Sequence, residues 1–124
     1  MNRNLDTPMM FLATKDARRA RAFYEGALGL LLESDEPYAL VFSIGKVMLR
    51  IQKVEEVTAP GYTSLGWKVE DIQAVAKDLL AKGVTFEDYA GLDQDENGIW
   101  KSPSGARVAW FKDPDGHVLS LTQI

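Results

Sequence analysis

The feature that most constrains the fold of this 124-residue chain is an order of predicted elements that occurs twice. Each half reads as a strand, a helix and three further strands. An aspartate suited to an N-cap precedes each helix, Asp16 in the first half and Asp71 in the second. Apolar residues then recur at i, i+3, i+4, i+7 and i+8, which is the pattern of one helix face, and Gly29 or Gly83 ends the run. The order of elements, rather than sequence identity, therefore predicts two βαβββ modules.

Short apolar or alternating runs between turn residues are predicted as strands. They cover residues 7–14, 30–34, 38–43 and 46–52 in the first half, and 62–69, 84–87, 107–111 and 118–123 in the second. Residues 54–61 show no period and contain Pro60 and Gly61, so we interpret them as a linker. The hypothesis is one domain over residues 1–124, with module one at about 7–53 and module two at about 62–124.

Composition removes several classes of function. The chain has no cysteine and one histidine, His117, so disulfides, thiol nucleophiles and cysteine-based zinc sites are excluded. Fourteen basic residues against 18 acidic ones leave no broad basic face for nucleic acid. No apolar run approaches the length of a membrane span, and the N-terminus lacks the apolar core of a signal peptide. We therefore expect a cytoplasmic protein that binds neither nucleic acid nor membrane.

Three segments carry a family resemblance. The first is the helix pattern D…A..FY…LGL from Asp16 to Leu30, the second is LGWKVED at 65–71, and the third is WFKDPDGHVLSL at 110–121. In this order they resemble the vicinal oxygen chelate superfamily of glyoxalases, bleomycin-resistance proteins and extradiol dioxygenases. The resemblance implies an α+β fold in which two βαβββ modules form a glyoxalase/bleomycin-resistance-type split barrel around a shared pocket. It also implies a homodimer.

Metal-using members of that superfamily hold their ion with four residues, usually His or Glu, on the first and fourth strands of each module. By position, the resemblance places these ligands at Met9, Arg50, Ser64 and Ser120. A thioether, a guanidinium and two hydroxyls are not an ordinary ligand set for a divalent ion. We therefore expect no metal and no other cofactor.

Arg50 is the most informative candidate in the pocket that the resemblance implies. It could fork onto a ligand carboxylate or phosphate, or it could face solvent or pair with an acidic residue of the chain. Its neighbours two residues away share its face of the strand. The other expected lining residues are Met9, Phe11, Met48, Ser64 and Ser120.

The acidic segment 93–98 begins like a calcium-binding loop, but Ser104 stands where such a loop needs a bidentate Glu. We interpret it instead as a flap, with Glu96 and Trp100 as contact residues. His117 follows a predicted type I turn at 113–116 and is expected to be exposed. The pattern does not decide which face of its strand Trp110 occupies.

The leading hypothesis is a metal-free protein that binds a small anionic or aromatic molecule, similar to the antibiotic-sequestering members of the superfamily. The alternative is a glyoxalase-type lyase or isomerase, using either metal bound by unusual oxygens or acid–base chemistry by Asp95 or Glu96. A regulatory or scaffolding domain without a ligand is the third possibility. No catalytic residue is assigned.

Overall fold

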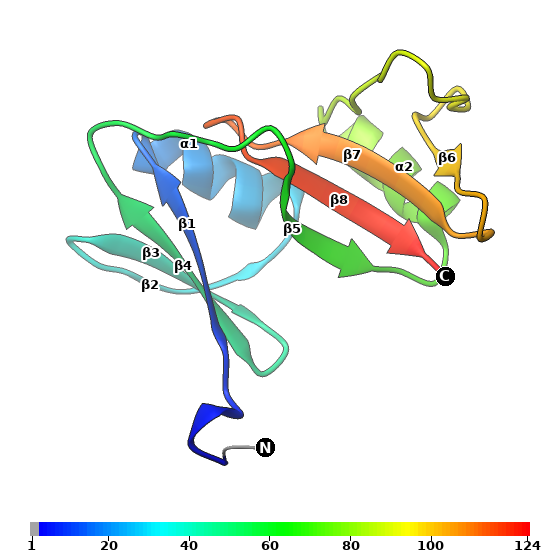
Figure 1. Ribbon diagram of the computed structural model, residues 1–124. Coiled ribbons are helices and arrows are strands. Elements are labelled where there is room, and N and C mark those ends of the chain that lie inside the picture. Colours follow the sequence, from blue (N-terminus) through cyan, green and yellow to red (C-terminus); the bar gives the residue numbers. More distant parts are fainter. Residues whose placement is uncertain (1–2) are drawn as a thin grey trace. The chain divides into compact units, whose positions relative to one another are not determined.

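A computed structural model describes residues 3–124 and divides the chain into two compact units, Met1–Thr58 and Ala59–Ile124. Each unit contains one four-stranded sheet (Figure 1). The elements of unit 1 are η1 (Arg3–Leu5), β1 (Met9–Thr14), α1 (Ala17–Arg21), η2 (Ala22–Ala27), β2 (Leu31–Asp35), β3 (Ala39–Ile44) and β4 (Val47–Lys53). Those of unit 2 are β5 (Thr63–Lys68), α2 (Ile72–Ala81), β6 (Trp100–Lys101), β7 (Arg107–Lys112) and β8 (Val118–Gln123). Both units have the predicted βαβββ order.

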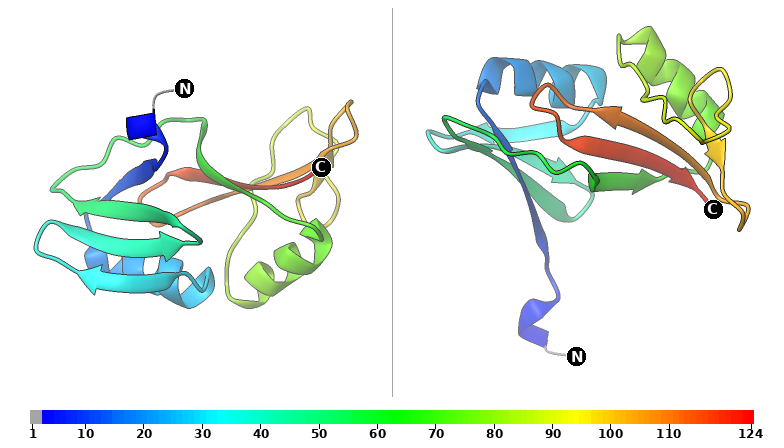
Figure 2. Two further views of the ribbon diagram at one scale, coloured as in Figure 1. Left: turned by 90° about the horizontal axis from the view of Figure 1, so that it is seen from below. Right: turned by 45° about the horizontal axis from the view of Figure 1, so that its top comes forward.

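The sheet of unit 1 has the order β1-β4-β3-β2, with β1 parallel to β4 and the other pairs antiparallel. The helical segment lies against one face of this sheet (Figure 2). The ring of Tyr24 is fully buried there, 5.9 Å from the ring of Phe42. The core on this face is completed by Leu12, Ala20, Leu40, Leu49 and Ile51. The opposite face is the one that carries Arg50, because neighbouring strand residues point to opposite faces.

The first helix begins as predicted and then changes its geometry. The Asp16 carboxylate accepts the backbone N–H of Arg19 at 3.1 Å, which is an N-cap bond. From Ala22 the helix continues as a π-helix, in which the Leu28 N–H donates to the Phe23 carbonyl at 2.9 Å. The apolar spacing of the sequence predicts a regular α-helix here instead. Tyr24 within this segment is still buried, so the apolar spacing predicts which face of the helix meets the core but not the wider turn.

Unit 2 has the order β5-β8-β7-β6, and α2 packs on the face that carries the buried residues of β7 and β8. Asp71 caps this helix by accepting the N–H of Ala74 at 3.1 Å. The first helical N–H, at Ile72, donates to the side chain of Gln123 at 2.9 Å. This bond places the Gln123 face of β8 toward α2. The buried apolar residues of the unit include Ala76, Leu79, Ala109, Phe111, Leu119 and Leu121.

The strand predicted at 84–87 is wrong. Phe86 makes a single isolated bridge to Phe111, and the Glu87 N–H donates to the Trp110 carbonyl at 2.7 Å. The edge of the sheet is instead formed by the two-residue strand β6. Gln94 holds the intervening chain in place, since its side chain bonds the Tyr89 N–H and the carbonyls of Glu87 and Gly98. These side-chain bonds replace the strand pairing that apolar spacing alone had predicted.

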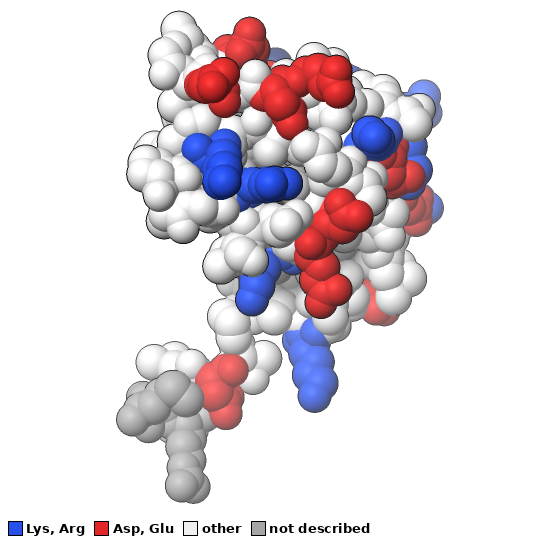
Figure 3. Space-filling model, turned by 90° about the vertical axis from the view of Figure 1, so that its right-hand side faces the viewer, with Lys and Arg blue, Asp and Glu red and all other residues white. Residues whose placement is uncertain are grey.

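Within residues 3–124, no helix is both long enough and apolar enough to cross a membrane. On the face seen in Figure 3, basic and acidic side chains form small interspersed groups. That mixture gives the face no extended field of one sign, which a phosphate backbone would require.

Candidate functional site

The open face of the unit 1 sheet brings four of the predicted site residues together. Parallel pairing of β1 with β4 sets Met9 beside Met48 and Phe11 beside Arg50. The two methionines are 46% and 38% exposed, and Phe11 is 53% exposed. An apolar patch of two flexible thioethers and one aromatic ring thus surrounds a guanidinium on a rigid sheet. Adaptable thioethers and an aromatic ring suit a planar or apolar ligand.

Arg50 makes an ion pair on this face, which was one of the alternatives for this residue. Its Nη2 lies 3.3 Å from Oε1 of Glu36, and the two side chains are 27% and 45% exposed. Ser34 Oγ donates to the other carboxylate oxygen of Glu36 at 2.9 Å. A half-exposed pair of this kind contributes about 0–1 kcal/mol. The guanidinium has five N–H donors, so this contact leaves it able to bind an incoming anion as well.

The open face of unit 2 carries Ser120 and Trp100, together with a residue whose orientation the sequence did not decide. Trp110 pairs with Ser120 across β7 and β8, on the face opposite α2. Its ring lies 6.0 Å from that of Trp100 and 5.4 Å from that of Tyr89. Ser120 is 8% exposed. This face therefore presents an aromatic cluster beside a buried hydroxyl, and Tyr89 is a member that sequence reasoning missed.

Ser64 is exposed and lies where the pairing of β5 with β8 shifts register, between Thr63 and Leu65. Two residues further on, Gly66 lies beside Ser120, and a Cβ at Gly66 would come within 2.5 Å of the Ser120 Oγ. A larger residue at position 66 would therefore require the Ser120 hydroxyl to rotate away from β5. The four expected ligand positions remain divided between the two units, and the role of each serine stays a prediction.

Glu96 lies apart from the aromatic cluster. It is exposed and lines a cavity of about 380 Å³ that also includes Leu80 of α2. The carboxylate of the neighbouring Asp95 is already hydrogen-bonded within its loop, because it accepts the backbone N–H groups of Asn97 and Ile99 at 2.8 and 2.9 Å. Burial raises the pKa of Asp95, but these bonds, the Gln73 amide and the Arg107 charge together lower it by more, so the pKa lies below its ordinary value. A carboxylate of lowered pKa is a weak general base.

His117 contradicts the expectation of an exposed side chain. It is 5% exposed, and its Nδ1 lies 2.8 Å from Oδ2 of Asp113. The predicted turn is present, with the Gly116 N–H donating to the Asp113 carbonyl at 3.0 Å. The sequence did contain a signal for the hydrogen bonds of this turn, because an aspartate at the position of Asp113 can accept the backbone N–H two residues on. The sequence did not show that Asp113 and the His117 imidazole are both buried.

The four positions that the resemblance assigns to a metal do not fit one. Met9 and Arg50 lie on the unit 1 sheet, and a guanidinium repels a divalent cation. Ser64 and Ser120 offer neutral hydroxyls. Across residues 3–124, His, Asp and Glu side chains form no group of three or more that could hold an ion.

The comparisons with known proteins agree with this architecture. The model of the Glyoxalase/Bleomycin resistance protein/Dioxygenase superfamily matches residues 7–121. The chain therefore belongs to that superfamily, and the resemblance carried by its three motifs is confirmed. No curated protein matches the chain.

Several solved structures share the fold. A lactoylglutathione lyase from Agrobacterium tumefaciens is 17% identical with a TM-score of 0.74, and the match covers 98% of this chain and 96% of that one. A superfamily member from Sphaerobacter thermophilus DSM 20745 is 22% identical with a TM-score of 0.72, covering 95% and 96% of the two chains. One from Nocardioides is 22% identical with a TM-score of 0.73, covering 99% and 85%. These matches confirm the predicted α+β fold of two βαβββ modules. At sequence identities this low, they show a shared fold and not a shared function.

Proposed function

We propose that this protein binds a small anionic molecule with an aromatic or apolar body, without a metal, as the antibiotic-sequestering members of its superfamily are expected to do. The observation that carries the proposal is the juxtaposition of Arg50 with Phe11 on the open face of the unit 1 sheet. The guanidinium supplies charge-assisted hydrogen bonds, and Phe11, Met9 and Met48 supply the apolar contact. The ion pair of Arg50 with Glu36 is half-exposed and therefore weak, so a ligand anion can compete for the guanidinium.

Glyoxalase-type chemistry is the alternative function, and the lactoylglutathione lyase among the structural neighbours is the reason to retain it. Its acid–base version needs a carboxylate that is free to accept a proton. Asp95 is bound by N–H donors and has a lowered pKa, and Glu96 is exposed in a loop. These observations favour binding without catalysis.

Replacing Arg50 by Gln tests the ligand proposal. The probes are 1-naphthoate and its neutral counterpart 1-naphthamide, measured by isothermal titration calorimetry. We expect Arg50→Gln to weaken naphthoate binding by about tenfold or more, because a charge-assisted hydrogen bond is lost. Naphthamide binding should change little. Phe11→Ala should weaken both probes, because it removes the shared aromatic contact.

Arg19→Gln is the matched control, since Arg19 is an exposed arginine of α1 in the same unit. It should leave both affinities unchanged. Urea unfolding of each variant establishes that the sheet is intact. Equal naphthoate affinity in the wild type and Arg50→Gln would contradict the role of Arg50, and no binding of either probe by the wild type would contradict the ligand class.

Native mass spectrometry of the freshly purified chain tests the remaining parts of the proposal. We expect a homodimer, for which the exposed Leu31 and Tyr38 offer apolar surface at 63% and 81% exposure. We also expect no stoichiometric divalent ion. A tightly held ion in each chain would contradict metal-free binding and favour the lyase alternative.

A further inference from the structure

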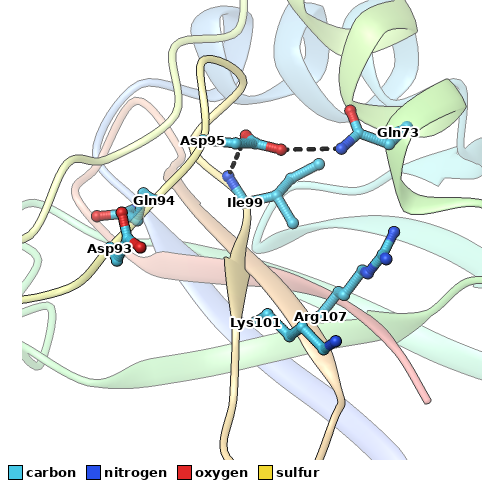
Figure 4. Close-up of a pocket in the computed structure, with 7 residues that line it drawn as sticks. All are labelled: Gln73, Asp93, Gln94, Asp95, Ile99, Lys101 and Arg107. Carbon is cyan, nitrogen blue, oxygen red and sulfur yellow. Dashed lines mark hydrogen bonds between the residues drawn. The ribbon is translucent and has the colours of Figure 1, made fainter.

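A second cavity lies in unit 2, on the side of the sheet that carries α2. Its volume is about 320 Å³, within the range of small-molecule pockets. Its walls come from α2, the loop before β6, and the strands β6 and β7 (Figure 4). Their side chains are Gln73, Asp93, Gln94, Asp95, Ile99, Lys101 and Arg107. None of them belongs to the Arg50 face of unit 1.

One wall of this cavity is held by its own hydrogen bonds. Asp95 accepts the Gln73 amide at 2.8 Å, in addition to two backbone N–H groups of its loop (Figure 4). The carbonyl of Gln73 in turn accepts the Asn97 amide at 2.9 Å. Gln94 is bonded through both ends of its amide. This wall is therefore preorganised, and its polar groups need no ligand.

The opposite wall is different, because it holds two cations in direct cross-strand register. Lys101 of β6 pairs with Arg107 of β7, which places both side chains on the α2 side of the sheet. Both residues are exposed, and neither forms a salt bridge with a side chain of residues 3–124. The Arg107 charge nevertheless acts on the Asp95 carboxylate across the cavity and lowers the pKa of that group. Like charges directly opposite each other in a sheet are destabilising. An anion between them would relieve that repulsion.

Protection of the sheet edge is a simpler explanation for a charged residue here, but it accounts for Lys101 and not for Arg107. A lysine on an edge strand such as β6 blocks pairing with other chains. Arg107 is not on the edge, since β7 lies between β6 and β8. Its side chain extends toward Gln73 (Figure 4). A guanidinium and an ammonium that line the same cavity are groups that proteins use to bind oxyanions.

We propose that the cavity binds the carboxylate or phosphate group of a small molecule between Lys101 and Arg107. Arg107 offers a fork of N–H donors to two oxygens, and Lys101 adds a compact positive charge from the neighbouring strand. The Asp93 and Asp95 carboxylates also line the cavity and repel an anion, so we expect the oxyanion to lie on the Lys101 and Arg107 side. This site is independent of the proposed ligand face in unit 1.

The test is an NMR titration of the full chain with sodium phosphate and, separately, with sodium succinate, at constant ionic strength set by sodium chloride. We expect saturable shifts of the backbone amides of Ile99, Lys101 and Arg107 with one or both anions. Arg107→Gln and Lys101→Gln should each weaken binding by roughly tenfold, the effect expected for losing one charge-assisted hydrogen bond. Phosphate alone, succinate alone, or both in saturation would assign the preferred oxyanion and support the site.

Lys77→Gln is the matched control, because Lys77 is an exposed lysine of α2 that does not line the cavity. It should bind the anions as the wild type does. Arg50→Gln should also retain full binding, so failure of the unit 1 proposal would be recognised separately. Shifts that do not saturate, or that are equal in chloride, would overturn the proposal, as would unchanged affinity in both cavity variants.

Discussion

Replacing Asp113 by Ala is expected to lower the free energy of unfolding by about 3 kcal/mol, measured by urea denaturation. The Asp113 side chain is 1% exposed and faces His117 Nδ1 at 2.8 Å. Its Oδ1 also accepts the N–H groups of Asp115 and His117, each at 2.9 Å. The substitution removes these acceptors together and leaves a buried imidazole without its carboxylate. Buried polar groups that lose a partner account for many of the largest single-residue effects.

Two further variants identify the cause of this loss in unfolding free energy. Asp113→Asn keeps an oxygen acceptor for the backbone N–H groups, so we expect it to retain part of the stability that Ala loses. Asp88→Ala removes one carboxylate from an exposed position in the same unit, and it should change stability by less than about 0.5 kcal/mol. If Asp113→Ala is no less stable than Asp88→Ala, the buried Asp113–His117 pair is not a stabilising element.

Replacing Gly98 by Ala is the second large expected effect, a loss of about 3 kcal/mol in the free energy of unfolding. Gly98 has φ +80°, a conformation that side chains with a Cβ rarely adopt. An added Cβ would also lie 2.9 Å from the Phe86 Cβ. The Phe86 Cβ is bonded directly to the backbone, so it cannot move away unless the backbone moves. Backbone strain and steric overlap therefore act together at this position.

Gly91→Ala separates the two causes. Gly91 lies in the same connection with φ +87°, and nothing lies within 4 Å of a Cβ added there. Its variant should lose only the strain, about 1 kcal/mol. The difference between the two variants then measures the overlap with Phe86. Equal losses would show that the loop adjusts to the new methyl group, and that the Phe86 contact is not fixed.

Local signals in the sequence predicted much of the architecture. Each helix start was readable from an aspartate that bonds an N–H three residues on, at Asp16 and at Asp71. The turn at 113–116 was readable for the same reason, because its bond spans three residues. Such features are decided within a few residues of chain, so no tertiary partner is needed to recognise them.

The candidate site was predictable only in part. The alternation in 46–52 placed Met48 and Arg50 on one face, and the structure has them there, beside Met9 and Phe11 of β1. The partner of Arg50 was not readable. Glu36 lies beyond the end of β2, and the pairing of β2 with β3 shifts register between Leu32 and Ser34. One residue of shift reverses which side chains share a face, and no local pattern records it.

The sequence by itself therefore determined the duplicated βαβββ order, the helix caps and the turn at 113–116, because each depends on bonds between near neighbours in the chain. Tertiary structure alone decided the inward packing of His117, the short edge strand β6, and the face of Trp110 opposite α2. It also decided that Lys101 of β6 and Arg107 of β7 are cross-strand partners on one face of the sheet. All of these depend on strand register and side-chain packing between distant segments, which hydrophobic spacing along one segment does not specify.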